Sequence, residues 1–238
     1  MITLAIDTSD ARGSVAVLRG ERVVAVRTHA DSSDYSAWLL SAVDDVLLSA
    51  SCTVKQVERF AVCTGPGSFT GLRVGLTAVK AWAEIFGRPI MGLSRLAVLA
   101  RSEKVTSTFA VSCYDAHRDE LFAGLYRVGS MELQQVGEDL VTSPTNLLAA
   151  VDRLVGGEPV TWVSLDPERI ESLGLFEQRI DRGDRVLRAA PELASVLGKL
   201  AMVDAARKWL SDPLTLDANY VRRSDAEILW KGGAPGGR

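Results

Sequence analysis

The chain has 238 residues, enough for one large domain or for two lobes of roughly 100 residues each. A net charge of −3 provides no basic footprint for binding nucleic acid unaided, and 47% apolar residues are ordinary for a globular protein. No apolar run approaches the roughly 20 residues that span a bilayer, and no basic segment precedes the first apolar run. We therefore expect a cytoplasmic protein, in which Cys52, Cys63 and Cys113 are buried thiols without metal-type spacing.

The first hundred residues predict a mixed sheet covered by helices. Three apolar runs separated by turn residues indicate strands at Ile2–Ile6, Ser14–Leu18 and Val23–Thr28. A helix is expected next, over Tyr35–Ala50, from the helical spacing of its apolar residues. A strand at Phe60–Cys63, a helix over Leu72–Phe86, a strand at Pro89–Gly92 and a helix begun by Ser94 should follow. This order predicts five strands in one sheet.

The glycine-rich segment Thr64–Gly75 lies between a predicted strand and a predicted helix, where backbone amides could bind an anion. Its glycine spacing fits neither a dinucleotide loop nor a Walker loop, and Pro66 removes one amide donor. Gly71, Gly75 and Ala78 fall on one helical stripe, which would allow a neighbouring helix to approach closely. We favour this packing role over an anion site.

The second half predicts a similar, looser arrangement. Strands are expected at Phe109–Cys113, Leu121–Val128, Leu133–Val141 and Thr161–Leu165. Helices are expected over Pro144–Val155, where Ser143 is the cap, and over Pro191–Leu210. We predict a first lobe at 1–103 with the partner-binding helices, a second lobe at 104–230, and a disordered tail at 231–238.

Three segments resemble the bacterial TsaB (YeaZ) family: Leu4–Ser9, Gly65–Gly75 and Asp115–Glu120, with a weaker match at Ala218–Arg222. The resemblance implies an α/β protein with the two-lobed fold of actin, Hsp70 and sugar kinases (the ASKHA fold), in which each lobe is a mixed sheet flanked by helices. It also implies a function, because family members are partners in making N6-threonylcarbamoyladenosine (t6A), the modified adenosine beside the anticodon of certain tRNAs.

In that family a paralogous subunit, TsaD, transfers the threonylcarbamoyl group, and a small ATPase, TsaE, joins the pair. Members also form homodimers through the helices of the first lobe. The resemblance thus implies a non-catalytic subunit that has no cofactor of its own and that meets tRNA and ATP only within the complex.

The positions that would hold a metal argue independently against catalysis. The catalytic paralogue carries a His-x-x-x-His pair, whose two imidazoles share one helix face and hold a metal ion. The matching positions here are Arg95 and Leu99, which cannot serve as that pair. The two histidines, His29 and His117, fall in different predicted lobes. We therefore expect no metal site and no catalytic residue.

Asp7, Thr8 and Ser9 are the residues that could lie near a nucleotide, because ATPases of this fold place an acid after the first strand. Alternatively, the Asp7 side chain only bonds the backbone of its own turn. Thr8 and Ser9 would crowd a phosphate, so we disfavour nucleotide binding by this chain alone.

The predicted helices are the remaining candidates for function. Trp38 and Trp82 lie off the main apolar stripes, as interface anchors do. The predicted partner interface comprises Trp38, Leu39, Val43, Val46, Gly71, Gly75, Ala78 and Trp82. The alternative is that the stripes face only the chain's own sheet.

Two further functions stay open, an ATP-dependent phosphotransferase of this fold and a metallopeptidase-like enzyme. A stand-alone RNA-binding module is disfavoured by the acidic balance. If the chain is a partner subunit, Gly75→Arg or Val43→Asp should abolish pairing while the monomer stays folded.

Overall fold

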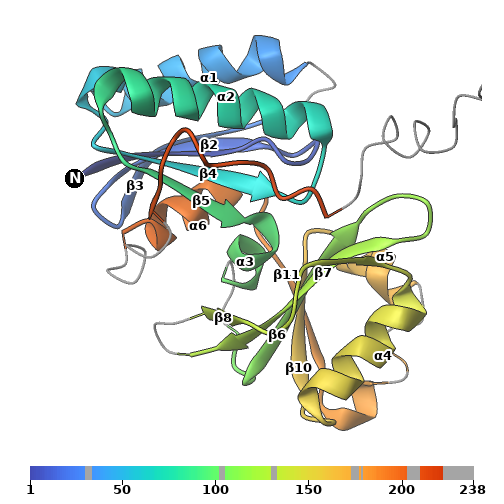
Figure 1. The fold of residues 1–238 in the computed structure, drawn as a ribbon. Coiled ribbons are helices and arrows are strands. Elements are labelled where there is room, and N and C mark those ends of the chain that lie inside the picture. Colours follow the sequence, from blue (N-terminus) through green and yellow to red (C-terminus); the bar gives the residue numbers. More distant parts are fainter. Residues whose placement is uncertain are drawn as a thin grey trace, which may run out of the picture.

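The computed structural model describes residues 1–29, 34–101, 105–129, 133–172, 177, 179–202 and 210–221. The chain forms two lobes, each built on a sheet with helices against its faces (Figure 1). None of the helices in these ranges is long and apolar enough to cross a membrane.

The first lobe has a six-stranded sheet in the order β12-β5-β4-β1-β2-β3. Strands β1 and β2 pair antiparallel, whereas β4 and β5 run parallel to β1. Side chains of β1 alternate between the two faces, since Leu4 and Ile6 pack on one side of the sheet and Ala5 on the other. The strands are β1 (Ile2–Asp7), β2 (Ser14–Arg19), β3 (Arg22–Thr28), β4 (Arg59–Gly65), β5 (Ile90–Ser94) and β12 (Leu210–Ser211).

Helices α1 (Tyr35–Ser49) and α2 (Phe69–Phe86) lie side by side on one face of this sheet, and α6 (Leu193–Leu200) covers the other (Figure 1). The Ser68 side chain caps α2 by accepting a hydrogen bond from the Gly71 amide, and Gly87 ends the helix in the left-handed conformation. A short helix, α3 (Arg95–Ala100), contacts both sheets and so lies between the lobes.

The second lobe repeats the strand pattern of the first. Strands β6 and β7 pair antiparallel, and β10 runs parallel to β6, as β4 does to β1. Helix α4 (Pro144–Val155) packs on the face away from α3 (Figure 1). The strands are β6 (Phe109–Asp115), β7 (Leu121–Val128), β8 (Leu133–Gln135), β9 (Leu140–Thr142), β10 (Val160–Ser164) and β11 (Arg185–Arg188), and the remaining short helices are η1 (Val54–Gln56), α5 (Pro167–Glu171) and η2 (Ile180–Arg182).

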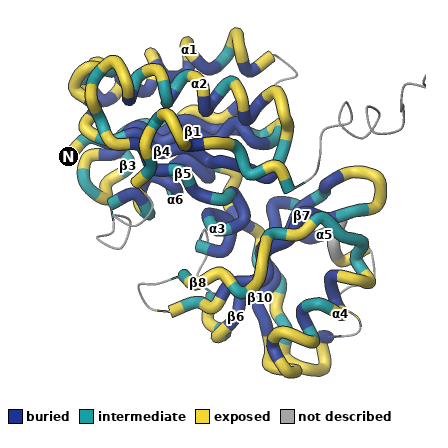
Figure 2. Tube along the Cα trace, in the orientation of Figure 1, coloured by how far each residue is buried: buried dark blue, intermediate teal, exposed yellow. Residues whose placement is uncertain are grey.

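Buried apolar residues form three clusters, and one of them joins the lobes. This shared cluster includes Ala5 and Ala61 of the first sheet, Leu96 and Leu99 of α3, and Tyr114 of the second sheet. Figure 2 shows the buried strands continuing through α3 into the second lobe. The lobes are therefore packed together through a dry core.

Most predicted strands and helices are confirmed within a few residues. The single strand predicted at Leu133–Val141 is wrong, because the chain breaks into β8 and β9 around Gly137, whose φ is +79°. The helix predicted over Pro191–Leu210 is too long, since α6 ends at Leu200 and Leu210 belongs to β12.

The predicted second lobe, 104–230, is also corrected at its C-terminal part. Helix α6 packs on β1, β2 and β4, and β12 pairs with β5, so this part of the chain returns to the first lobe. The first sheet thereby gains a sixth strand beyond the five predicted. The predicted boundary at 103 and the predicted tail at 231–238 lie outside the described residues.

Candidate functional site

The turn after β1 and the loop after β4 pack directly on each other at the buried junction of the two lobes around Asp7, Arg95 and Tyr114, which we call the cleft. The Ser68 amide donates a hydrogen bond to the Ser9 carbonyl at 2.7 Å. A Cβ placed on Gly67 would lie 2.0 Å from the same carbonyl oxygen, so only glycine fits there. An amide of the loop that could have bound an anion is therefore bonded within the chain.

The two glycines of α2 allow this helix to approach the end of β1. A Cβ on Gly71 would lie 2.1 Å from the Thr8 carbonyl oxygen, and one on Gly75 would lie 2.3 Å from Thr8 Oγ1. Thr8 Oγ1 donates a hydrogen bond to the Gly71 carbonyl at 2.7 Å. The packing role predicted for this stripe is confirmed, although the neighbour is the turn after β1 and not a second helix.

Arg95 occupies the centre of the cleft. Its side chain is completely buried, and Nε lies 3.3 Å from Oδ2 of the equally buried Asp7. Nη2 lies 3.3 Å from Asp10 Oδ2, and the guanidinium carbon stands 4.6 Å from the centre of the Tyr114 ring, which comes from the second lobe. A protein cation thus sits against the acid that follows β1.

The charges continue from Arg95 into the second lobe. Arg12 lies 3.5 Å from Asp10 and binds the carboxylate of Asp166 through both of its terminal nitrogens, with Nη1 2.7 Å from Oδ1. Tyr114 Oη donates a hydrogen bond to the Pro66 carbonyl at 2.6 Å. Acidic and basic groups therefore alternate across the cleft and tie the two lobes together.

The pKa values of these groups favour the charged pair. Burial lowers the pKa of Arg95, but Asp7, Tyr114 and Asp10 together raise it above its usual value, so the guanidinium stays charged. Burial raises the pKa of Asp10, but Arg95, the Ala11 amide and Arg12 bring it below its usual value of 3.8. The stabilisation from Asp10 is thus present above that value and is lost as the pH falls through the lower folded-state pKa.

A second carboxylate, Asp139, joins the lobes through neutral donors. It accepts hydrogen bonds from Ser94 Oγ and Asn219 Nδ2 of the first lobe, both at 2.8 Å, and from Tyr126 Oη of the second at 3.1 Å. Burial raises its pKa, and the hydrogen bonds oppose that shift. The hydrogen bonds of Asp139 therefore link the lobes independently of the charged groups around Arg95.

The residues predicted to lie near a nucleotide, Asp7, Thr8 and Ser9, are all buried in these packed segments. The Asp7 carboxylate also accepts a hydrogen bond from the Ser9 amide at 3.0 Å, as the turn alternative had it. Within the described ranges, no three His, Cys, Asp or Glu residues are grouped so as to hold a metal ion. Sequence reasoning missed the role of Arg95 in this cleft, although a lone arginine among the apolar residues of Leu93–Leu99 was a signal.

The outer face of α1 and α2 is the second candidate site, and it differs from the predicted interface. Leu39, Val43 and Val46 are buried against the sheet, and Gly71 and Gly75 are buried against β1. These five residues are therefore unavailable to a partner in this fold, because the stripes face the chain's own sheet.

Three of the predicted residues keep part of their surface. Trp38, Ala78 and Trp82 are half-buried. Trp38 packs edge-on to the Tyr35 ring with centroids 5.8 Å apart, and Trp82 stacks on Phe60 at 6.1 Å. They stay candidates for a partner contact.

Large apolar side chains that the sequence reasoning did not select are exposed on the same two helices. Leu40, Leu48 and Ile85 are 58%, 80% and 71% exposed. We call Leu40, Leu48, Ala78, Trp82 and Ile85 the outer helical face, because they are exposed or half-buried apolar residues of α1 and α2. Figure 2 shows these two helices along the top of the first lobe. Its signal in the sequence was apolar residues off the main stripe of each helix.

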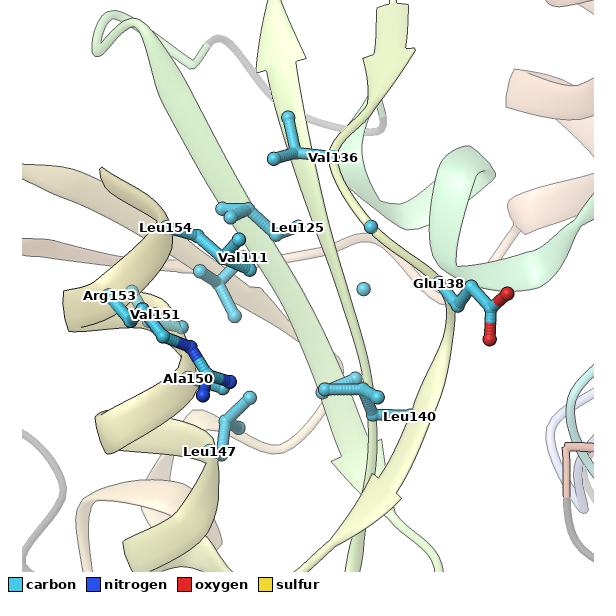
Figure 3. A pocket seen from close by; sticks show the side chains of 13 residues that line it. Val111, Leu125, Val136, Glu138, Leu140, Leu147, Ala150, Val151, Arg153 and Leu154 are labelled. Atoms are coloured by element: carbon cyan, nitrogen blue, oxygen red, sulfur yellow. The ribbon is translucent and has the colours of Figure 1, made fainter. Parts of the chain in front are cut away.

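The second lobe has a separate hollow of about 120 Å³ between α4 and β7. Figure 3 shows that apolar side chains, among them Leu125, Leu147 and Val151, point into it, whereas the Glu138 carboxylate points away. Ligand sites typically enclose roughly 300–1,000 Å³ and have converging polar groups. This hollow is too small and too apolar to be the functional site.

A family model described as TsaD, tRNA N6-adenosine threonylcarbamoyltransferase, matches residues 27–160, more than half of the chain. A Bacillus subtilis protein named tRNA threonylcarbamoyladenosine biosynthesis protein TsaB is 28% identical over 97% of this chain and 98% of its own length. The chain belongs to this family, on its TsaB (YeaZ) branch.

Solved structures agree with this membership in the TsaB (YeaZ) family. A Pseudomonas aeruginosa protein described as similar to peptidase YEAZ has a TM-score of 0.72 and 25% identity, covering 93% of this chain and 99% of that one. A ROK hexokinase from Thermus thermophilus has a TM-score of 0.53 at 10% identity, covering 85% of this chain and 98% of that one, and so shares the fold alone. The predicted two-lobed ASKHA fold is confirmed.

Proposed function

We propose that this chain is a non-catalytic partner subunit in the formation of t6A on tRNA. The observation that carries the proposal is the buried Arg95–Asp7 pair in the cleft, where kinases of this fold place phosphates and magnesium. An arginine at that point supplies the positive charge that a metal ion would otherwise bring. The names of the relatives support the pathway, and the filled cleft supports the absence of catalysis.

The same packing supports a chain without a nucleotide or metal of its own. A divalent cation beside Asp7 would have to displace a fully buried guanidinium, and a triphosphate would have to separate the Gly65–Ser68 loop from Ser9. ATP then acts only within the complex. This distinguishes the proposal from its alternative, an ATP-dependent phosphotransferase or metallopeptidase-like enzyme.

The outer helical face is the surface we assign to the partner. Helices α1 and α2 together expose leucine and isoleucine side chains and keep Trp82 half-buried, and exposed apolar side chains with an aromatic residue are typical of a docking surface. The partner is a TsaD-like catalytic subunit, with a TsaE-like ATPase joining the pair. In the absence of these partners, the same face joins two copies of this chain in a homodimer. The chain contacts tRNA only as part of the complex, which acts in the cytoplasm.

The test is a double substitution on this face, Leu48→Asp with Ile85→Asp. Both side chains are mostly exposed, so the free energy of unfolding of the variant should lie within about 1 kcal/mol of the wild-type value. Burying two carboxylates in a docked interface should weaken binding to the TsaD-like subunit by roughly a hundredfold or more. Size-exclusion co-elution and a binding titration with that subunit measure the loss.

The matched control is Ile180→Asp, which changes an apolar residue of the second lobe that is 60% exposed, and this variant should bind normally. Wild-type affinity in the double variant would contradict the assigned face. The earlier choices, Gly75→Arg and Val43→Asp, are unsuitable tests, because both positions are buried and the variants would not stay folded.

Calorimetric titration of the isolated chain with Mg-ATP separates the proposal from the enzyme alternative. We expect no heat of binding up to millimolar nucleotide, because Arg95 and its partners fill the cleft. Micromolar affinity, or ATP hydrolysis by the chain alone, would favour the phosphotransferase. Elemental analysis with stoichiometric zinc or iron would favour the metallopeptidase-like enzyme.

A further inference from the structure

An exposed cluster of two aromatic rings and one arginine lies where α2 begins. Phe69 and Tyr220 are 40% and 41% exposed, and their ring centroids are 5.3 Å apart. The Arg73 guanidinium carbon stands 3.8 Å from the centre of the Phe69 ring, and Arg73 Nε donates to Tyr220 Oη at 3.4 Å. We call Phe69, Arg73 and Tyr220 the aromatic corner.

The corner is held in place by the backbone beneath it. Phe69 is the first residue of α2, directly after the Ser68 cap. The neighbour of Tyr220, Asn219, is fixed twice: its amide donates to the Thr64 carbonyl at 2.7 Å, and its side chain donates to Asp139. The two rings are therefore preorganised, and a ligand that stacks on them would not have to order them first.

The corner carries the positive charge of Arg73, which has no acidic partner in the part of the chain that the structure describes. By contrast, Arg12, Arg95 and Arg179 all have acidic partners. The first turn of α2 contains no acidic residue, so the positive end of the helix dipole adds to the charge. An anionic ligand is favoured here.

Flat rings beside a guanidinium that has no carboxylate partner among the described residues suit a ligand that combines π-faces with negative charge. Unpaired RNA bases stack on aromatic side chains and on arginine planes, and their phosphates bind the free guanidinium N–H groups. Double-stranded RNA offers phosphates but no accessible base faces. An acidic protein surface would use Arg73 and leave Phe69 and Tyr220 with no specific role.

We infer that the aromatic corner binds unpaired nucleotides of the tRNA, with a base against Phe69 and Tyr220 and a phosphate on Arg73. The inference rests on the proposed function for its choice of RNA. It names the part of this chain that touches the nucleic acid, which a net charge of −3 left unassigned.

The test uses the full chain, alone and with the TsaD-like subunit, and a fluorescent hairpin RNA with the stem and loop of a tRNA anticodon arm. Phe69→Leu should weaken binding by about tenfold, because base–aromatic stacking is lost while apolar volume is kept. Arg73→Gln should weaken it similarly and reduce the salt dependence by about one counterion. Arg22→Gln, which removes an exposed charge from the edge strand β3, is the control and should stay within about twofold of wild type.

The same stem closed into an uninterrupted duplex should bind more weakly and should not distinguish Phe69 from Leu. Equal binding of the hairpin by wild type, Phe69→Leu and Arg73→Gln, or no binding in either setting, would overturn the inference. Loss of affinity for the TsaD-like subunit with unchanged RNA binding would also overturn it, and would reassign the corner to the protein partner. If the complex with the TsaD-like subunit forms normally but RNA binding does not respond to Phe69→Leu or Arg73→Gln, the proposed function stands and only this inference fails. If the wild-type chain does not form that complex, the proposed function itself is refuted.

Discussion

Replacing Arg95 with methionine should destabilise the protein by about 3–5 kcal/mol, the usual cost of leaving one member of a buried ion pair without its partner. The Asp7 carboxylate would stay buried after losing its ion pair, and of its neighbours on the turn after β1 the Ser9 amide would still donate a hydrogen bond to it. The contact between the Arg95 guanidinium and the Tyr114 ring would be lost as well. Urea unfolding at neutral pH measures the change.

A double-mutant cycle makes this expectation specific. Asp7→Asn with Arg95→Met removes both charges, and replacing both members of a buried pair is often nearly neutral. The double variant should therefore be more stable than Arg95→Met alone. Additive losses from the two substitutions would show that the pair is not coupled.

The matched control for the cycle is Arg182→Met, which breaks an ion pair with Asp152 in which both side chains are more than two-fifths exposed. Exposed ion pairs contribute at most about 1 kcal/mol to stability, so the free energy of unfolding of this variant should be close to that of the wild type. A loss as large as that of Arg95→Met would mean that burial is not what makes the cleft pair important.

Gly71→Ala should destabilise the protein by about 1–3 kcal/mol, against the direction of helix propensity. Alanine is favoured over glycine inside a helix by about 1 kcal/mol, so propensity alone predicts a gain. The added Cβ would instead lie 2.1 Å from the Thr8 carbonyl oxygen, and α2 would have to move away from β1. Thermal or urea unfolding tests the sign.

Two other positions on α2 separate sterics from propensity. Gly75→Ala meets the Thr8 side chain instead of backbone, so the hydroxyl can rotate and the loss should be smaller. Ala81→Gly, on the exposed side of the helix, should cost about 1 kcal/mol by propensity alone. If Gly71→Ala were as stable as the wild type, the close approach of α2 to the turn after β1 would be refuted.

The sequence was a good guide to elements whose signal is local. Short apolar runs separated by turn residues predicted β1, β2 and β3. Ser143 and Pro144 correctly predicted that α4 begins at Pro144. The short strands β11 and β12 were missed, because two to four residues are too few for a periodic pattern.

The sites were harder to predict, because they depend on segments that are distant along the chain. Asp7 and Arg95 are 88 positions apart, and nothing near either residue indicates that they meet. For the helices, periodicity located the buried stripe correctly, but it could not say whether that stripe faces the chain's own sheet or a partner. The exposed Leu48 and Ile85 became candidates only when the sheet had claimed Leu39, Val43 and Val46.

Because α6 packs on the first sheet, the first lobe can complete its folding only after α6 has been synthesised, and the chain cannot be truncated between its two halves without exposing that sheet. Leu193, Ala194 and Leu197 cover the face of β1 and β2 opposite to α1, and the Ala194 amide bonds Ser14 Oγ at 3.0 Å. While the ribosome is still making the second half, that face of the nascent sheet stays uncovered. The amino-terminal hundred residues are thus no autonomous folding unit, and a truncation between the halves would leave an aggregation-prone apolar surface.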